Sequence, residues 1–253
     1  MSNPQRILVI QGHISAALMD PNYAASMEMP LEQVLQATQR DLLTATQVLG
    51  QNYQSSVDEV GNDAQFLATV PVTGAAIGSG RSAATRSELN ALAQTFEALL
   101  KIHPEYFQIR LISADQHGLE LVRVDRDGTG LVRVEGLDLQ EKAHYPYVFK
   151  TLRLKRGQVY LSDISINHEL GAHAGLLKPT LRVAAPVFNG GERAAAVVVI
   201  NIDLNRMFAK LRADLPASYQ VYLANQWGDY LVHPDATQAF GFDQGRRILV
   251  QET

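Results

Sequence analysis

A run of apolar residues spaced three and four apart constrains the fold of this chain more than any other feature. It includes Leu31, Val34, Leu35, Leu42, Val48 and Leu49 and continues through Val57, Val60, Ala64 and Leu67. This spacing predicts one amphipathic helix over 31–70, with Pro30 at its start and Pro71 and Gly74 after its end. A helix of about 40 residues is roughly 60 Å long, so we expect it to serve as a spine or a dimer seam.

Beyond this helix the apolar period changes from helical to extended. Residues 75–87 are small and polar and predict a loop, and a second helix is expected from Ser87 to Leu100. Five strands are then predicted at 106–112, 119–125, 158–164, 181–188 and 194–203, with short helical pieces within 138–150. A short helix at 204–211 follows them.

The pattern restarts after Pro216, with predicted strands at 219–224 and 230–233 joined by a turn. Two helices, a five-stranded antiparallel sheet and a further strand pair predict an α+β fold with a partial second copy attached. A length of 253 residues and 46% apolar content are sufficient for such a core.

Charge and composition exclude several classes of function. The net charge is −4, so no general positive field recruits nucleic acid or anionic lipid. There are no cysteines, which excludes disulfides, thiolate metal sites and cysteine nucleophiles. The N-terminal apolar run, Ile7 to Ile10, is far shorter than the ~20 residues that span a bilayer.

Motifs for catalysis or metal binding find little support. His168 and His173 lie five residues apart, which turns them about 140° away from each other on a helix, so we expect solvated loop histidines instead of a zinc site. There is no P-loop, G-x-S-x-G or G-x-G-x-x-G sequence. The carboxylates of Glu120, Asp125 and Asp127 are typical of surface hairpins.

Three arginines inside apolar strands are more informative. Arg110, Arg123 and Arg182 each lie within a predicted strand of the same sheet. A guanidinium held by a covered sheet must meet an acid, either in the protein or on a ligand. Internal pairs with Glu120, Asp163 or Glu169 are the alternative, but three arginines on neighbouring strands favour a shared pocket.

Aromatic residues are concentrated next to these strands. Tyr145, Tyr147 and Phe149 lie in the polar stretch that would cover the arginines, and Tyr160 and Ser162 share one face of the next strand. Aromatic walls with a few charged or hydroxyl groups are typical of a small-molecule site. Core aromatics with satisfied hydroxyls are the alternative.

Five segments in this order resemble the double Cache sensor domains, also called PDC sensors. They are YFQIRLI at 106–112, GLELVRVD at 118–125, GQVYLS at 157–162, LRVAAPVF at 181–188 and VVVINID at 197–203. Such domains are the extracytoplasmic ligand-binding parts of bacterial histidine kinases, diguanylate cyclases and chemoreceptors. The similarity covers about residues 31–250.

The resemblance implies a long N-terminal helix that carries PAS-like sheets. Residues 1–30 would be an N-terminal extension, 31–72 the spine helix, 73–213 the membrane-distal module and 214–253 the start of an incomplete, truncated membrane-proximal module. It implies signalling without catalysis in this portion, a location at the periplasmic face of the inner membrane, a membrane-anchored parent chain and a homodimer through the long helix.

Carried over by position, the resemblance implies six ligand-facing side chains and neither a metal nor another cofactor. The six are Arg110, Arg123, Tyr147, Tyr160, Ser162 and Arg182. The pattern of the amino-acid-binding branch is not recognisable, because the only tryptophan is Trp227. We therefore expect a small anionic metabolite as the ligand and a cytoplasmic kinase or cyclase as the output. The alternative is a ligand-free module that recognises a partner binding protein.

The segment WGDYLVHPDATQAFGFDQG at 227–245 places His233 two residues from Asp235. A hydrolase that uses His233 or the region of His168 and His173 is a further alternative. However, the pair has no nucleophile at a suitable spacing, and Pro234 holds His233 in an extended conformation. We therefore interpret the segment as the opening hairpin of the second module.

Overall fold

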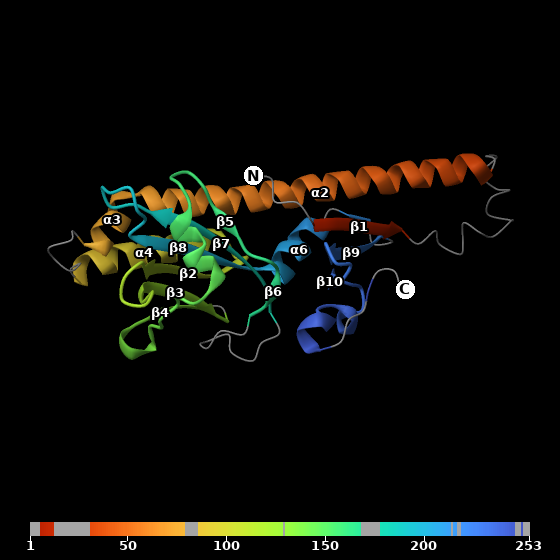
Figure 1. Ribbon diagram of the computed structural model, residues 1–253. Helices are drawn as coiled ribbons and strands as arrows, with labels where there is room; N and C mark the ends of the chain where they lie inside the picture. The colour runs from red at the N-terminus through yellow and green to blue at the C-terminus, as the bar shows by residue number, and fades with distance from the viewer. Residues whose placement is uncertain are drawn as a thin grey trace. The chain divides into compact units, whose positions relative to one another are not determined.

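The computed structural model describes residues 6–12, 31–78, 86–128, 130–167, 178–213, 215–216, 219–245 and 249 (Figure 1). The chain divides into two compact units. The first combines Met1–Ser55 with Phe208–Thr253, and the second is Ser56–Met207. The division falls within the predicted spine helix, which therefore contributes residues to both units.

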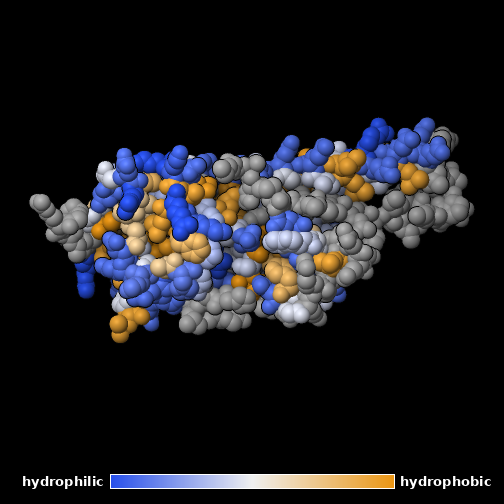
Figure 2. All heavy atoms as spheres, viewed as in Figure 1, coloured by the Kyte–Doolittle hydropathy of each residue, from blue (hydrophilic) through white to orange (hydrophobic). Residues whose placement is uncertain are grey.

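The spine helix is α2 (Leu31–Thr69), which is 39 residues long and confirms the prediction from the apolar spacing. In the second unit its buried side chains include Val57, Val60, Ala64 and Leu67, again three and four apart. The surface of α2 visible in Figure 2 is mostly hydrophilic, with a few apolar patches.

A short helix follows α2 where a loop was expected. Pro71 begins α3 (Pro71–Ile77), so the loop predicted from residue 75 is wrong for residues 75–77. Proline is tolerated in the first turn of a helix, because its ring sets a helical φ and its missing N–H needs no partner there. The second long helix, α4 (Arg86–Ile102), buries Leu92 and Phe96.

The second unit contains a seven-stranded antiparallel sheet. Its strands are β2 (Tyr106–Ser113), β3 (Glu120–Asp127), β4 (Gly130–Val134), β5 (Tyr160–Leu161), β6 (Ser165–Ile166), β7 (Pro179–Val187) and β8 (Ala196–Asp203). The order is β4-β3-β2-β8-β7-β5, and β6 also pairs with β7. The long N-terminal helix and the antiparallel sheet confirm the α+β prediction.

The sheet differs from the five predicted strands at its two edges. The prediction omitted β4, a short edge strand that is partly exposed along its length. The strand predicted at 158–164 is shortened to β5, and β6 follows just beyond this range; the two pair with different parts of β7. Edge strands are short and partly solvated, so their sequences carry a weaker apolar signal than the fully buried β2, β7 and β8.

Both faces of the central strands are covered. Helix α4 packs against β2 and β3. The short helix α5 (Pro146–Phe149) packs on the face that carries Ile112, Ala184 and Val199, and in Figure 1 it lies across the front of the sheet. Helix α5 confirms the helical structure expected within 138–150, and the 3-10 helices η2 (Gly136–Asp138) and η3 (Thr151–Arg153) lie at either end of that range.

The first unit holds a smaller sheet with the order β1-β9-β10. Strand β9 (Tyr219–Asn225) pairs with β10 (Tyr230–Val232), as the restarted pattern predicted, and also with β1 (Arg6–Gly12), which was not predicted. Helix α6 (Leu204–Arg212) precedes it, and the turns η4 (Ala236–Gln238) and η5 (Gly241–Gln244) follow. None of the described helices is both long and apolar enough to cross a bilayer.

Tyr106 on β2 joins the large sheet to α2. Its hydroxyl donates a 2.7 Å hydrogen bond to Asp63 Oδ2, and the His103 ring stacks on its ring with centroids 4.5 Å apart. Burial raises the pKa of Tyr106 well above its usual value, and the hydrogen bond to Asp63 and the charge of Asp63 raise it further. The contact therefore depends on a protonated phenol.

We expect Tyr106→Phe to lower the free energy of unfolding by about 1.5–3 kcal/mol at pH 8, because the Asp63 carboxylate loses a donor. A tyrosine with a raised folded pKa stabilises fully below its unfolded pKa and less as the pH rises above it. The cost of the substitution should therefore shrink above about pH 10, by about 1.4 kcal/mol per pH unit.

Urea unfolding at pH 8 and at pH 11 measures this effect. Tyr222→Phe is the control for loss of a hydroxyl alone, because that hydroxyl donates to the neutral Gln220 side chain. A cost of Tyr106→Phe that is the same at both pH values would contradict the prediction.

Candidate functional site

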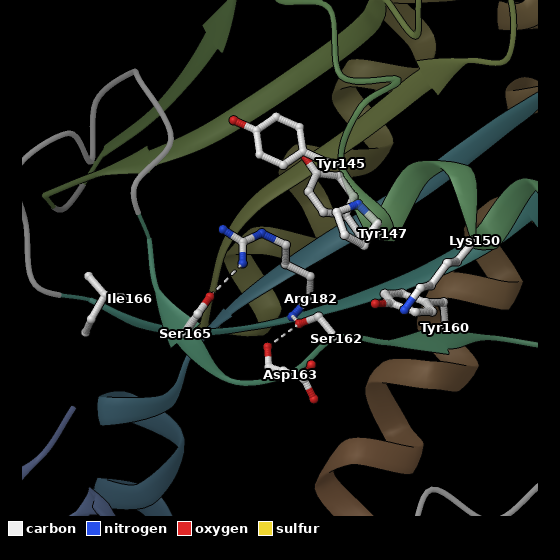
Figure 3. Close-up of a pocket in the computed structure, with 10 residues that line it drawn as sticks. Tyr145, Tyr147, Lys150, Tyr160, Ser162, Asp163, Ser165, Ile166 and Arg182 are labelled. Atoms are coloured by element: carbon white, nitrogen blue, oxygen red, sulfur yellow. Dashed lines mark hydrogen bonds between the residues drawn. The ribbon is translucent and has the colours of Figure 1, made fainter. Parts of the chain in front are cut away.

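A cavity of about 300 Å³ lies beside α5, β5, β6 and β7 in the second unit (Figure 3). Its walls carry three tyrosines, two cations, one carboxylate and two serines. The lining residues are Tyr145, Pro146, Tyr147, Lys150, Tyr160, Ser162, Asp163, Ser165, Ile166 and Arg182. This mixture of aromatic and polar groups has the composition of a small-molecule site.

Helix α5 supplies the aromatic side of the cavity. Pro146 stands in its first turn, and the Thr151 hydroxyl donates a 2.6 Å hydrogen bond to Tyr147 O. The rings of Tyr145 and Tyr147 stack with centroids 5.3 Å apart. Tyr147 is buried, whereas Tyr145 is half-buried, so the pair extends from the core to the cavity.

Arg182 on β7 supplies the cationic side. Its Nη2 donates a 2.9 Å hydrogen bond to Asn167 Oδ1, its Nη1 lies 3.4 Å from Ser165 Oγ, and its Cζ lies 5.5 Å from the Tyr147 ring centroid. The pairing of β5 with β7 continues beyond Leu161, because Ser162 Oγ accepts a 2.9 Å hydrogen bond from Arg182 N. Arg182 is thus held by backbone and side chain at a fixed place in the wall.

Two further charges stand at the mouth of the cavity. The Lys150 ammonium lies 5.7 Å from the Tyr160 ring centroid, and Lys150 forms no ion pair with any described residue. Asp163 is exposed between β5 and β6. Burial raises the pKa of Tyr160, and the charge of Asp163 adds to this effect while Arg182 opposes it. The Tyr160 phenol therefore stays protonated at neutral pH and can donate a hydrogen bond.

The other two predicted arginines have internal carboxylate partners. Arg123 Nε and Nη2 donate to Asp125, the shortest contact being 2.7 Å. Glu120 accepts from Arg110 Nη1 at 3.3 Å and lies 3.5 Å from Arg123 Nη1. All four side chains are buried, so the interpretation of Glu120 and Asp125 as surface-hairpin carboxylates is wrong. This arrangement matches the alternative of internal pairs that the sequence left open for these two positions.

Neither Arg110 nor Arg123 is among the residues that line the cavity. Arg110 still lies near it, because its Cζ is 5.1 Å from the centroid of the Tyr147 ring, which Arg182 also approaches. Tyr147 therefore connects the buried ionic cluster to the cavity wall. The structure brings together Tyr147, Tyr160, Ser162 and Arg182 of the six predicted side chains.

Six lining residues were not among the six candidates: Tyr145, Pro146, Lys150, Asp163, Ser165 and Ile166. Tyr145 belongs to the aromatic cluster that the sequence already showed. Ser165 lies three residues after Ser162, beyond the kink that separates β5 from β6. Lys150 follows α5 and Asp163 lies between β5 and β6, and the packing of α5 against β7 brings these two single charges to one cavity.

Of the three histidine candidates, His233 is the one that lies among the described residues. His168 and His173 lie outside the described residues. The Asp235 carboxylate accepts hydrogen bonds from Thr237 N and Oγ1, at 2.9 and 2.8 Å, which lower the pKa of Asp235. The His233 ring packs against Tyr222 and Tyr230. Asp235 thus caps the turn at η4, as the hairpin interpretation expects.

No group of three or more metal-ligating side chains occurs among the described residues. The side chains in question are histidine, cysteine, aspartate and glutamate.

Gly118 fixes the start of the segment that leads to α5. Its φ is +72°, and a Cβ there would lie 2.5 Å from Ala143 N and 2.8 Å from Ala143 Cα. Gly118 O accepts a 2.8 Å hydrogen bond from Lys142 N, which holds the segment against the turn. Any larger residue would push this segment away.

We expect Gly118→Ala to lower the free energy of unfolding by about 2–3 kcal/mol, because it adds a steric clash to an unfavourable left-handed φ. Gly128→Ala is the matched control, since its φ is +58° but a Cβ there meets no atom within 4 Å. The control should cost only about 1 kcal/mol. Equal costs in chemical denaturation would show that the approach of Ala143 is unimportant.

Comparison with known proteins gives a family match and a set of similar structures. The model of the family described as bacterial histidine kinase, sensor domain, matches residues 82–249. A search of curated protein sequences gives no match. The chain is therefore placed by its family and its fold.

Three of the similar structures are sensor domains of different receptors. The extracellular domain assigned to the histidine kinase vpHK1S-Z8 has a TM-score of 0.68 and 20% identity, covering 83% of this chain and 75% of that chain. A domain assigned to a sensory box/GGDEF family protein of Vibrio parahaemolyticus has a TM-score of 0.69 and 20% identity, covering 86% and 77%.

The ligand-binding domain of the Campylobacter jejuni chemoreceptor Tlp3, solved with 4-methylisoleucine, has a TM-score of 0.57 and 12% identity, covering 84% and 75%. At these identities the likeness to each of the three shows the fold alone.

Proposed function

This chain belongs to the family of bacterial histidine kinase sensor domains, and we propose that it binds a small anionic metabolite in the cavity beside α5 and β7. The family match confirms the resemblance to PDC-type sensors that the sequence indicated. The fold is that of a sensory domain, and we propose that a cytoplasmic kinase or cyclase in the same parent chain provides the output.

The observation that carries the proposal is the pair of cations in the cavity wall. Arg182 and Lys150 both line it, and Lys150 has no carboxylate partner among the described residues. A guanidinium held in place by Asn167 and Ser165 is preorganised to receive a carboxylate or phosphate group. Tyr160 and Tyr145 offer hydroxyls and aromatic faces for the remainder of the ligand.

The ligand-free alternative predicts a different structure for the region of the cavity. A module that only recognises a partner protein would fill the cavity with side chains and pair all its arginines internally. Arg110 and Arg123 are paired internally, but a volume of about 300 Å³ remains beside Arg182. That open volume is the reason we favour ligand binding.

We further propose that the parent chain is anchored in the inner membrane, faces the periplasm and forms a homodimer through α2. Leu43 and Val48 on this helix are 63% and 47% exposed, which supports a helix seam. Movement of α2 against a second copy would then carry the signal. The Tyr106–Asp63 hydrogen bond provides one connection from the sheet to this helix.

A thermal-shift screen of carboxylates, phosphates and amino acids tests the proposal. An anion at 100 times its dissociation constant should add about 2.7 kcal/mol of stability. Asp163→Asn should raise the affinity for that anion by about threefold or more, because a like charge leaves the mouth of the cavity. The same variant would weaken the binding of a zwitterion, such as the amino acids in the chemoreceptor structures, because Asp163 would pair with the ammonium group of a zwitterion.

Lys150→Gln should weaken anion binding, whereas Lys155→Gln is the matched control at an exposed position that does not line the cavity. The proposal would fail if no anion stabilised the wild type. It would also fail if every stabilising ligand raised the stability of Lys150→Gln as much as that of the control.

A further inference from the structure

A second cavity of about 310 Å³ lies at the C-terminal end of α2 and shares no lining residue with the first. It is bounded by the junction of α2 and α3, by the loop at Arg156 and Gly157, and by the end of β7 as far as Phe188. All of these residues belong to the second unit. The proposed anion site therefore does not account for this space.

The walls of this second cavity are mainly apolar and are held by specific hydrogen bonds. Val70, Pro71 and Val187 are among its lining residues. Gln65 Nε2 donates a 2.8 Å hydrogen bond to Gly157 O, which attaches the loop to α2. Gly74 also lines the cavity, and a Cβ there would meet no atom within 4 Å, so the space beside α3 is open.

One cation stands at the edge of this apolar space. The Arg156 Cζ lies 4.2 Å from the Phe188 ring centroid, and Arg156 Nη2 donates a 2.9 Å hydrogen bond to Gly191 O. Arg156 forms no ion pair with any described residue. A guanidinium that rests on an aromatic ring and is held at one nitrogen still presents N–H donors that can bind a carboxylate.

We propose that this cavity binds a small carboxylate with a flat apolar body, such as an aromatic acid. The carboxylate would pair with Arg156, and the apolar body would lie against Val70, Pro71 and Val187. Buried apolar surface and one charge-assisted contact would both contribute to the affinity.

This site differs from the first in its contact with the spine. Its walls include Ala68 and Thr69 at the end of α2, whereas no residue of α2 lines the first cavity. A ligand there would touch the helix directly. It would therefore bias the junction of α2 and α3 without first moving the sheet.

Ligand-observed NMR with benzoate as the probe tests the proposal, and benzamide serves as the uncharged analogue. We expect saturable binding of benzoate to the whole chain and at least about tenfold weaker binding of benzamide. Arg156→Gln should weaken the binding of benzoate by a similar factor. Gly74→Leu should abolish binding by filling the cavity, while the fold is kept because leucine favours a helix more than glycine does.

Lys150→Gln separates the two sites, because that side chain lines only the first cavity. Benzoate binding that is unchanged in Lys150→Gln and lost in Gly74→Leu supports the proposal. Binding that is lost in Lys150→Gln and retained in Gly74→Leu would place benzoate in the first cavity and overturn it. The absence of saturable binding to the wild type would overturn it as well.

Discussion

Replacing Glu120 with glutamine is expected to lower the free energy of unfolding of the second unit by about 3–5 kcal/mol. Glu120 is fully buried, with Oε1 3.3 Å from Arg110 Nη1 and Oε2 3.5 Å from Arg123 Nη1. Its Oε2 also accepts a 3.1 Å hydrogen bond from Gln140 N. The substitution leaves two buried guanidiniums with Asp125 as the remaining carboxylate of this cluster.

The size of the effect follows from desolvation. A buried charge loses its hydration, and only a partner of opposite charge at short distance compensates for that loss. Removing one partner costs more than the pair contributes, because the remaining charge stays buried. Replacing both members of a pair by apolar residues is often nearly neutral for the same reason.

Chemical denaturation of three variants measures this effect. Glu135→Gln is the control, because Glu135 is 68% exposed and its ion pair with Arg133 should contribute less than about 1 kcal/mol. The double variant Arg110→Met with Glu120→Leu should be more stable than Glu120→Gln alone. If Glu120→Gln costs no more than the control, the cluster does not stabilise the fold in the way we describe.

The sequence predicted that the strand arginines need acids and offered Glu120, Asp163 or Glu169, but it could not assign one of these acids to each arginine. The answer depends on strand register. Arg110 pairs across the strands with Arg123, and a register shift follows between Leu111 and Ile112, next to Glu120. Such an irregularity leaves no signature in residue type. Arg182 lies on β7, on the other side of β8 from these strands, where it donates a hydrogen bond to Asn167 and lines the cavity.

The same distinction between local pattern and packing applies to the fold. Helix α2 and strands β2, β7 and β8 were predictable, because each has a long and regular apolar period. Strand β1 was not, because a run of four apolar residues fits a strand as well as a buried helix. Its pairing with β9 joins segments more than 200 residues apart in the sequence, so no local signal specifies it.

The second large effect is expected at Arg182. Arg182→Gln should lower the affinity for the anion found in the screen by about 100-fold or more, because a positioned guanidinium donates two charge-assisted hydrogen bonds. Arg182→Lys should lose less affinity than Arg182→Gln does, since lysine keeps the positive charge but not the planar, two-pronged guanidinium. The side chain is 7% exposed, so the charge acts in a partly desolvated wall.

Isothermal titration of the wild type and the variants measures the affinities, and Arg153→Gln is the control. Arg153 lies over the Phe149 ring near α5 and is exposed, but it does not line the cavity. Because Arg182 also bonds Asn167 and Ser165, unfolding curves must show that each variant is folded at the titration temperature. A folded Arg182→Gln that binds the anion as well as Arg153→Gln does would remove the cation on which the proposed function depends.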